Sequence, residues 1–116
     1  MRVWNLTPHA VRYENDQVSQ VFLSDCVARA VQVDLQPFLV AGLVVVKRHY
    51  DGVEGVPTGV ADGDTLIVST ILADAMIASN NERWKKCSVL VPDTGPSCSR
   101  NPDGTVAFVS QFVLKT

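Results

Sequence analysis

Short valine-rich segments separated by turn residues make up most of the chain, and this pattern is typical of β-strands. Residues 26–34 also alternate in polarity, which predicts another strand. A closing strand at 105–114 follows a turn at 101–104, where Pro102 sets φ and Gly104 supplies a positive φ. The other predicted strands are residues 2–6, 10–14, 18–23, 65–69 and 88–92.

Two segments depart from this short-strand pattern. Residues 39–50 form a longer apolar run that Gly42 interrupts. Residues 51–64 carry four glycines and a proline, which predicts a surface loop between this run and the strand at 65–69.

The hydrophobic period changes after residue 69 and predicts a helix over 70–79. Ser69 or Thr70 is expected to cap its N-terminus, and Asn80 with Asn81 to end it. Residues 82–86 either extend the helix or form a further turn. The residues on the expected core-facing side are Ile71, Leu72, Ala75, Met76 and Ser79.

These elements predict a mainly β, α+β fold: a compact, mixed and mostly antiparallel sheet or partial barrel with one packed α-helix. No repeat, low-complexity tract or linker interrupts the sequence, so residues 1–116 are expected to form a single domain. A valine-rich chain of this size exposes strand edges that need cover, and we therefore expect a homo-oligomer.

Composition and charge exclude several classes of protein. The net charge of −2 argues against binding to a nucleic acid polymer, which requires a basic face. The longest apolar run, at 38–46, is far shorter than the roughly 20 residues of a membrane span. The N-terminus lacks the apolar region of a signal peptide, so a cytoplasmic location without a membrane partner is expected.

The three cysteines, Cys26, Cys87 and Cys98, are far apart and odd in number. Their spacing does not fit a structural zinc site, and the two histidines are also distant from each other. Reduced thiols are expected, with Cys26 and Cys87 buried as small hydrophobic side chains. Nothing in the sequence indicates a metal or a cofactor.

The tripeptide Asp93-Thr94-Gly95 follows an apolar strand, as it does in aspartic proteases. Such an enzyme needs two of these loops so that two carboxylates share a proton, which a chain this short could supply only as a homodimer. Residues 96–116 are too few for the flap and for the strands that shape the cleft. A strand end followed by a turn therefore explains the tripeptide better than a protease does.

Four short motifs occur in order along the chain: Asn5-Leu6-Thr7-Pro8-His9, Ile67-Val68-Ser69 before an alanine-rich helix, Val91-Pro92-Asp93-Thr94-Gly95-Pro96, and Asp103-Gly104 in a hairpin turn. In this respect the chain resembles small phage and prophage proteins of unassigned function. The resemblance covers about a hundred residues. It departs from the pattern at residues 76–87 and 97–101. It implies a phage origin and the host bacterial cytoplasm, and it implies no reaction.

Two polar loops stiffened by proline, at residues 7–9 and 93–99, follow predicted strands, and such loops carry function on a rigid scaffold. We expect the strands at 2–6 and 88–92 to be neighbours, in which case these two loops meet. The expected helix start adds free backbone N–H groups, which favour a phosphate or carboxylate. The candidate ligand-binding residues are Asn5, Thr7, His9, Ser69, Thr70, Asp93, Thr94, Ser97 and Arg100; no catalytic or metal-binding residue is assigned.

Simpler structural roles compete with these assignments. His9 can stabilise its own turn, and Asp93 can accept hydrogen bonds from backbone N–H groups of its own loop. Ser69 and Thr70 can serve as helix caps alone. The cationic residues at 47–49 form a second cluster, which can simply be the solvated end of a strand.

The favoured interpretation is a small phage protein that sequesters an anionic, nucleotide-like ligand, such as a nucleotide immune signal of the host. No activated nucleophile and no phosphate-binding glycine motif is present in the sequence, which favours binding over chemistry. One alternative is a hydrolase that acts on a nucleotide, with His9 as general acid or base and Asp93 orienting it. Another is a virion or assembly protein without a ligand.

Overall fold

The computed structural model describes residues 1–79 and 81–116. Within these ranges the chain is mostly strand with a single helix, and its pairings are mixed but mostly antiparallel, so the expected β-rich α+β class is confirmed. The elements are β1 (Val3–Asn5), β2 (Val11–Glu14), β3 (Ser19–Phe22), β4 (Arg29–Asp34), β5 (Phe38–Val40), β6 (Leu43–Val45), β7 (Arg48–Glu54), β8 (Thr65–Ile67), α1 (Thr70–Ser79), β9 (Ser88–Pro92), β10 (Ser99–Arg100), β11 (Val106–Phe108) and β12 (Phe112–Leu114).

The central sheet joins strands from both ends of the chain in the order β1-β8-β9-β12. β8 pairs in parallel with β1 on one side and with β9 on the other, and Leu66 lies opposite both Trp4 and Val89. β12 closes the sheet antiparallel to β9. Leu66 and Ile67 are buried, because a parallel strand between two neighbours is covered on both faces.

Helix α1 begins where the sequence predicts, because Leu72 N donates to Ser69 Oγ at 3.3 Å and Ser69 caps the helix. Its buried residues are Leu72, Ala73, Ala75 and Met76. Ile71 was expected in the core but is 52% exposed, since the buried stripe is rotated toward Ala73. The sequence predicted that Asn80 and Asn81 end the helix. Its last helical residue is Ser79, and Asn80 lies outside the described residues.

Side chains from the central sheet, from α1 and from the segments beside them fill the hydrophobic core. Leu6, Leu66, Val68, Leu72, Met76 and Val89 are each no more than 2% exposed. Both tryptophans, Trp4 and Trp84, are also buried in this core. Trp84 lies in the turn at residues 82–86 and donates its Nε1–H to the Met76 carbonyl oxygen at 3.0 Å. This turn therefore packs on the helix instead of extending it.

Asp64 is a buried carboxylate at the start of β8, and it is 5% exposed. It accepts hydrogen bonds from Trp4 Nε1 at 3.0 Å and from the backbone N–H groups of Ala61 at 3.0 Å and Arg2 at 2.9 Å. These bonds, that from Ala61 first, favour the charged form and lower the pKa of Asp64 to about 2. Asp64 thereby ties the N-terminal strand to the turn before β8.

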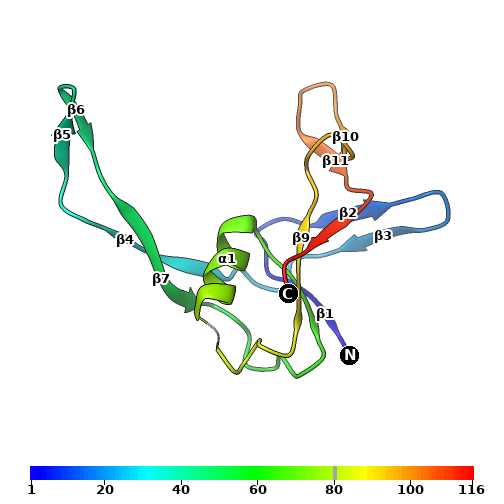
Figure 1. Ribbon diagram of the computed structural model, residues 1–116. Coiled ribbons are helices and arrows are strands. Elements are labelled where there is room, and N and C mark those ends of the chain that lie inside the picture. Colours follow the sequence, from blue (N-terminus) through cyan, green and yellow to red (C-terminus); the bar gives the residue numbers. More distant parts are fainter. Residues whose placement is uncertain (80) are drawn as a thin grey trace.

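Three hairpins project from the central sheet and helix (Figure 1). They are β2–β3, β10–β11 and a long hairpin, β4–β7, whose far end is the small β5–β6 ladder. The apolar run at 39–50 therefore contains parts of three strands, β5, β6 and the start of β7. A tight turn separates β5 from β6, and Ala41 and Gly42 in this turn both have positive φ.

Two sequence-based boundaries are wrong. The loop expected at 51–64 begins only after Glu54, because β7 continues through a β-bulge in which Asp51 and Gly52 lie opposite Val31. The single closing strand expected at 105–114 is divided into β11 and β12, because the chain leaves the β10–β11 hairpin and joins the central sheet around Ser110.

Gly55 follows β7 at the point where the long hairpin returns to the core. Its φ is +85°, and a Cβ at this position would lie 2.6 Å from the carbonyl oxygen of Val27. Gly52 has the same φ of +85°, but a Cβ there would meet nothing within 4 Å. Of these two glycines, only Gly55 combines a left-handed backbone with close contact to another segment.

The cysteines are all free thiols. Cys87 is buried as expected, whereas Cys26 is only partly buried. In the described part of the chain, no helix has the length and apolar character needed to cross a membrane.

Candidate functional site

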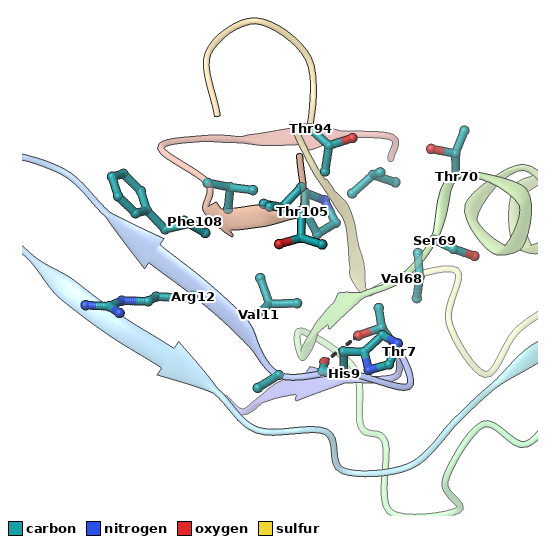
Figure 2. A pocket seen from close by; sticks show the side chains of 16 residues that line it. Thr7, His9, Val11, Arg12, Val68, Ser69, Thr70, Thr94, Thr105 and Phe108 are labelled. Atoms are coloured by element: carbon teal, nitrogen blue, oxygen red, sulfur yellow. Dashed lines mark hydrogen bonds between the residues drawn. The ribbon is translucent and has the colours of Figure 1, made fainter. Parts of the chain in front are cut away.

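A cavity of about 580 Å³ opens between the β1–β2 loop, the start of α1, the end of β9 and β11 (Figure 2). This volume falls within the range of small-molecule sites. Its polar lining residues are Thr7, His9, Arg12, Ser69, Thr70, Thr94 and Thr105. Its apolar lining includes Val11, Val68, Val91, Phe108 and Val109.

The β1–β2 loop is held in shape by Asn5, which is 1% exposed. Asn5 Nδ2 donates to the carbonyl oxygens of His9 at 2.9 Å and Phe22 at 2.8 Å. Asn5 Oδ1 accepts hydrogen bonds from Thr7 N at 3.0 Å and Thr7 Oγ1 at 2.6 Å. Both ends of the amide are thus used within the protein. Asn5 positions Thr7 and His9 at the cavity instead of lining it.

The start of α1 forms a second wall of the cavity. Ser69 Oγ accepts the Leu72 N–H, and Ser69 O accepts the first backbone hydrogen bond of the helix, from Ala73 N at 2.9 Å. The backbone N–H groups of Thr70 and Ile71 come before the first helical hydrogen bond. They therefore have no acceptor within the helix. They carry the partial positive charge of the helix N-terminus beside the cavity.

Asp93 uses its carboxylate to organise its own loop. It accepts hydrogen bonds from Gln111 Nε2 at 2.6 Å, Gly95 N at 3.0 Å and Ser97 Oγ at 3.2 Å. These bonds, led by that from Gln111, lower the pKa of Asp93 below its ordinary value. Asp93 and Ser97 are outside the lining of the cavity, and only Thr94 of this loop reaches it.

Arg100 also supports the loop instead of facing the cavity. Its guanidinium donates to the carbonyl oxygens of Thr94 and Gly104, each at 2.8 Å. It therefore joins the loop after β9 to the turn of the β10–β11 hairpin. Arg48, in the second cationic cluster, lies far along the hairpin and pairs with Asp34 at 2.7 Å.

We expected the strands at 2–6 and 88–92 to be neighbours, and this is wrong. β8 lies between β1 and β9. Their loops nevertheless reach one cavity, since all three parallel strands run toward it. Thr7, His9, Ser69, Thr70 and Thr94 come together there. This arrangement fits the general rule that ligands bind beyond the carboxyl ends of parallel strands.

Arg12, Thr105 and Phe108 line the cavity but were missed in the sequence. They belong to the β2–β3 and β10–β11 hairpins, whose positions over the sheet depend on tertiary contacts. Glu14 N donates to Val109 O at 3.0 Å and Val109 N to Arg12 O at 2.9 Å, so the two hairpins are joined beside the cavity. The polar and apolar alternation at 10–14 predicted the strand that carries Arg12. It did not indicate how the hairpin is oriented relative to the central sheet.

Comparisons with protein-family models, with curated proteins and with solved structures find no match to this chain. What the cavity binds therefore has to follow from its own chemistry.

That chemistry is an apolar floor with polar groups at its rim. In Figure 2, Val11 and Val68 project toward the centre, and the hydroxyl-bearing side chains of Thr7, Thr94 and Thr105 surround it. Arg12 also lines the cavity, but in Figure 2 its guanidinium extends away from Val11, and its Nε donates to Glu14 Oε1 at 2.8 Å. This ion pair is exposed, and such pairs are weak.

The arrangement supplies no recognisable catalytic set. Within residues 1–79 and 81–116, no hydrogen bond joins His9 to Asp93, whose oxygens are bound to Gln111, Gly95 and Ser97. Across the same ranges, no group of three His, Cys, Asp or Glu side chains is placed to hold a metal ion. The cavity therefore combines an apolar floor with hydroxyl groups and a helix N-terminus at its rim.

Proposed function

We propose that this protein binds and sequesters a small anionic ligand of the nucleotide class in the cavity of Figure 2. The observation that carries the proposal is the pairing of two ligand-binding features in one cavity. The N–H groups at the start of α1 suit phosphate oxygens, and the Arg12 guanidinium would add a charge-assisted hydrogen bond once it leaves Glu14 and turns toward the cavity. The valines and Phe108 offer an apolar surface of the kind on which a base can pack.

Sequestration is favoured over hydrolysis because Asp93 is committed to its own loop and leaves His9 without an orienting carboxylate. For a phage protein, which the sequence motifs suggest, the most economical ligand is a nucleotide immune signal of the bacterial host. Capture without chemistry is enough to interrupt such a signal.

The proposal is tested by thermal-shift measurement of the purified protein against linear nucleotides, cyclic nucleotides and ADP-ribose derivatives. A ligand at about 100 times its Kd adds roughly 2.7 kcal/mol of stability. For a domain of this size we expect the unfolding midpoint to rise by roughly 8 °C. After heat denaturation the ligand is recovered and identified by mass spectrometry. Recovery of unchanged ligand supports sequestration, whereas recovery of a product identifies an enzyme.

We expect Arg12→Ala to weaken binding of the identified nucleotide by about 10- to 100-fold, because a charge-assisted hydrogen bond to phosphate is lost. Arg29→Ala is the matched control, since Arg29 is an exposed arginine on β4 that does not line the cavity. Isothermal titration calorimetry measures both. Equal affinities for Arg12→Ala and Arg29→Ala would show that the anion binds elsewhere. If no nucleotide of the panel shifts the unfolding midpoint, a virion or assembly role becomes the favoured interpretation.

A further inference from the structure

The far end of the long hairpin, residues 35–46, is strongly apolar and exposed; we refer to it as the arm tip. Leu39 and Leu43 are each 67% exposed and Val44 is 76% exposed. No residue from 35 to 46 carries a charge, whereas Asp34, Lys47 and Arg48 immediately outside it do. The other exposed apolar side chains of the arm tip are Leu35, Phe38, Val40 and Val46.

Nothing else in the described part of the chain covers the arm tip. β5 pairs with β6 alone, and Figure 1 shows this ladder at the end of the hairpin, well away from the central sheet and α1. A two-stranded hairpin in water is marginally stable at best. Its free edges also lack the lysines and bulges that protect exposed edge strands. Pro37, just before β5, is the one protective residue of this kind in the arm tip. The arm tip therefore requires a partner surface.

The exposed surface has the composition of a stable interface. Seven apolar side chains of the arm tip are between 40% and 76% exposed, and they lie on both faces of the ladder and beside it. A mostly apolar surface without charges is typical of permanent assemblies and of homodimers, whereas transient interfaces are more polar. The partner is therefore one that is present whenever the protein is present.

A second copy of the same chain meets this requirement. Across a two-fold axis a surface faces itself, so any excess of one charge would repel its own copy. The arm tip carries no charge, and at its base Arg48 pairs with Asp34 at 2.7 Å, which leaves only the single positive charge of Lys47 beside it. The free strand edges of β5 and β6 can also continue into those of the partner copy.

We propose that two copies of this chain associate through their arm tips, which pack against each other about a two-fold axis. The association buries Leu39 and Val44, which lie opposite each other on one face of the ladder, in both copies, and it lies far from the cavity. It is independent of the proposed ligand, so the assembly forms without nucleotide.

Size-exclusion chromatography with light scattering tests the association on the full chain. We expect a mass of at least twice 12.6 kDa for the wild type, unchanged at about 1 M NaCl because the interface is apolar. Val44→Lys and Leu39→Lys are expected to raise the dissociation constant at least 100-fold and to elute as monomers. Val21→Lys is the control, because Val21 is a similarly exposed strand valine, at 51%, on the separate β2–β3 hairpin.

A monomeric wild type, or an oligomer that survives Val44→Lys, would overturn the proposal. Circular dichroism confirms that each variant is folded. If a lysine variant aggregates, a second variant replaces residues 36–45 with an Asn-Gly turn and removes the arm tip altogether. This shortened chain is expected to be a folded monomer that keeps its response to nucleotide, and a shortened chain that still dimerises would equally refute the inference.

Discussion

Gly55→Ala is expected to destabilise the fold by about 3 kcal/mol, and Gly52→Ala by only about 1 kcal/mol. Both glycines have a φ of +85°, so each substitution incurs the cost of a left-handed backbone for a residue with a Cβ. At Gly55 the added Cβ would also stand 2.6 Å from the Val27 carbonyl oxygen, where backbone must move to make room. Gly52 has open space around it.

Urea denaturation followed by circular dichroism measures both free energies of unfolding. The pair separates the two contributions, because conformational strain is common to both sites and the close approach belongs to Gly55 alone. Equal losses in the two variants would mean that the segment at Val27 moves aside easily, and that the junction between the long hairpin and the core is less rigid than its geometry indicates.

Asp64→Ala is expected to lower the midpoint of thermal unfolding at pH 7 by roughly 10 °C. The substitution removes the acceptor for Trp4 Nε1 and for two backbone N–H groups, and the Trp4 indole is buried with no alternative partner among the described residues. Asp62→Ala is the matched control, because Asp62 lies two residues away with its side chain 67% exposed. We expect its midpoint to remain within about 2 °C of the wild type.

The same carboxylate predicts a specific response to acid. The pKa of Asp64 falls from 3.8 to about 2 on folding, so the unfolded chain takes up a proton at a higher pH than the folded one. Its contribution to stability is complete above pH 4 and is lost as the pH falls from about 4 to about 2. The wild type should lose more stability than Asp64→Ala over this interval. Parallel curves for the two proteins would show that other carboxylates, such as Asp93, dominate acid unfolding.

Local patterns in the sequence predicted most elements, since strand and helix periods are properties of neighbouring residues. The helix at 70–79 and its Ser69 cap follow from a change of period and a hydroxyl side chain. The errors arose where tertiary structure overrides a local signal. Gly52 indicates a loop when only its neighbours are considered, but it occupies a bulge inside β7 because β4 lies beside it.

The residues of the candidate site likewise fall into those that local motifs predicted and those that depend on tertiary structure. Motif loops led to Thr7, His9, Ser69, Thr70 and Thr94, which share one cavity. Asn5 and Asp93 belong to the same motifs and Arg100 lies just after them. Their polar groups are nevertheless used within the protein, by backbone and, for Asp93, also by the Gln111 and Ser97 side chains, which depends on loop geometry. Arg12 and Thr105 could not be found from motifs, because they reach the cavity from hairpins placed over the sheet by long-range contacts.

The order of strands in the central sheet also governs when the protein can fold during synthesis. β1 is made first, yet its partner β8 emerges only some sixty residues later, and β12 at the opposite end of the chain completes the sheet. Hairpins form within microseconds from local contacts, whereas pairings across long chain separations are slow. The local pairing of the arm tip can therefore form on the nascent chain well before the core can close. If two copies associate through their arm tips as proposed, neighbouring ribosomes on one message would present matching apolar hairpins to each other, and assembly could begin while both cores are still being made.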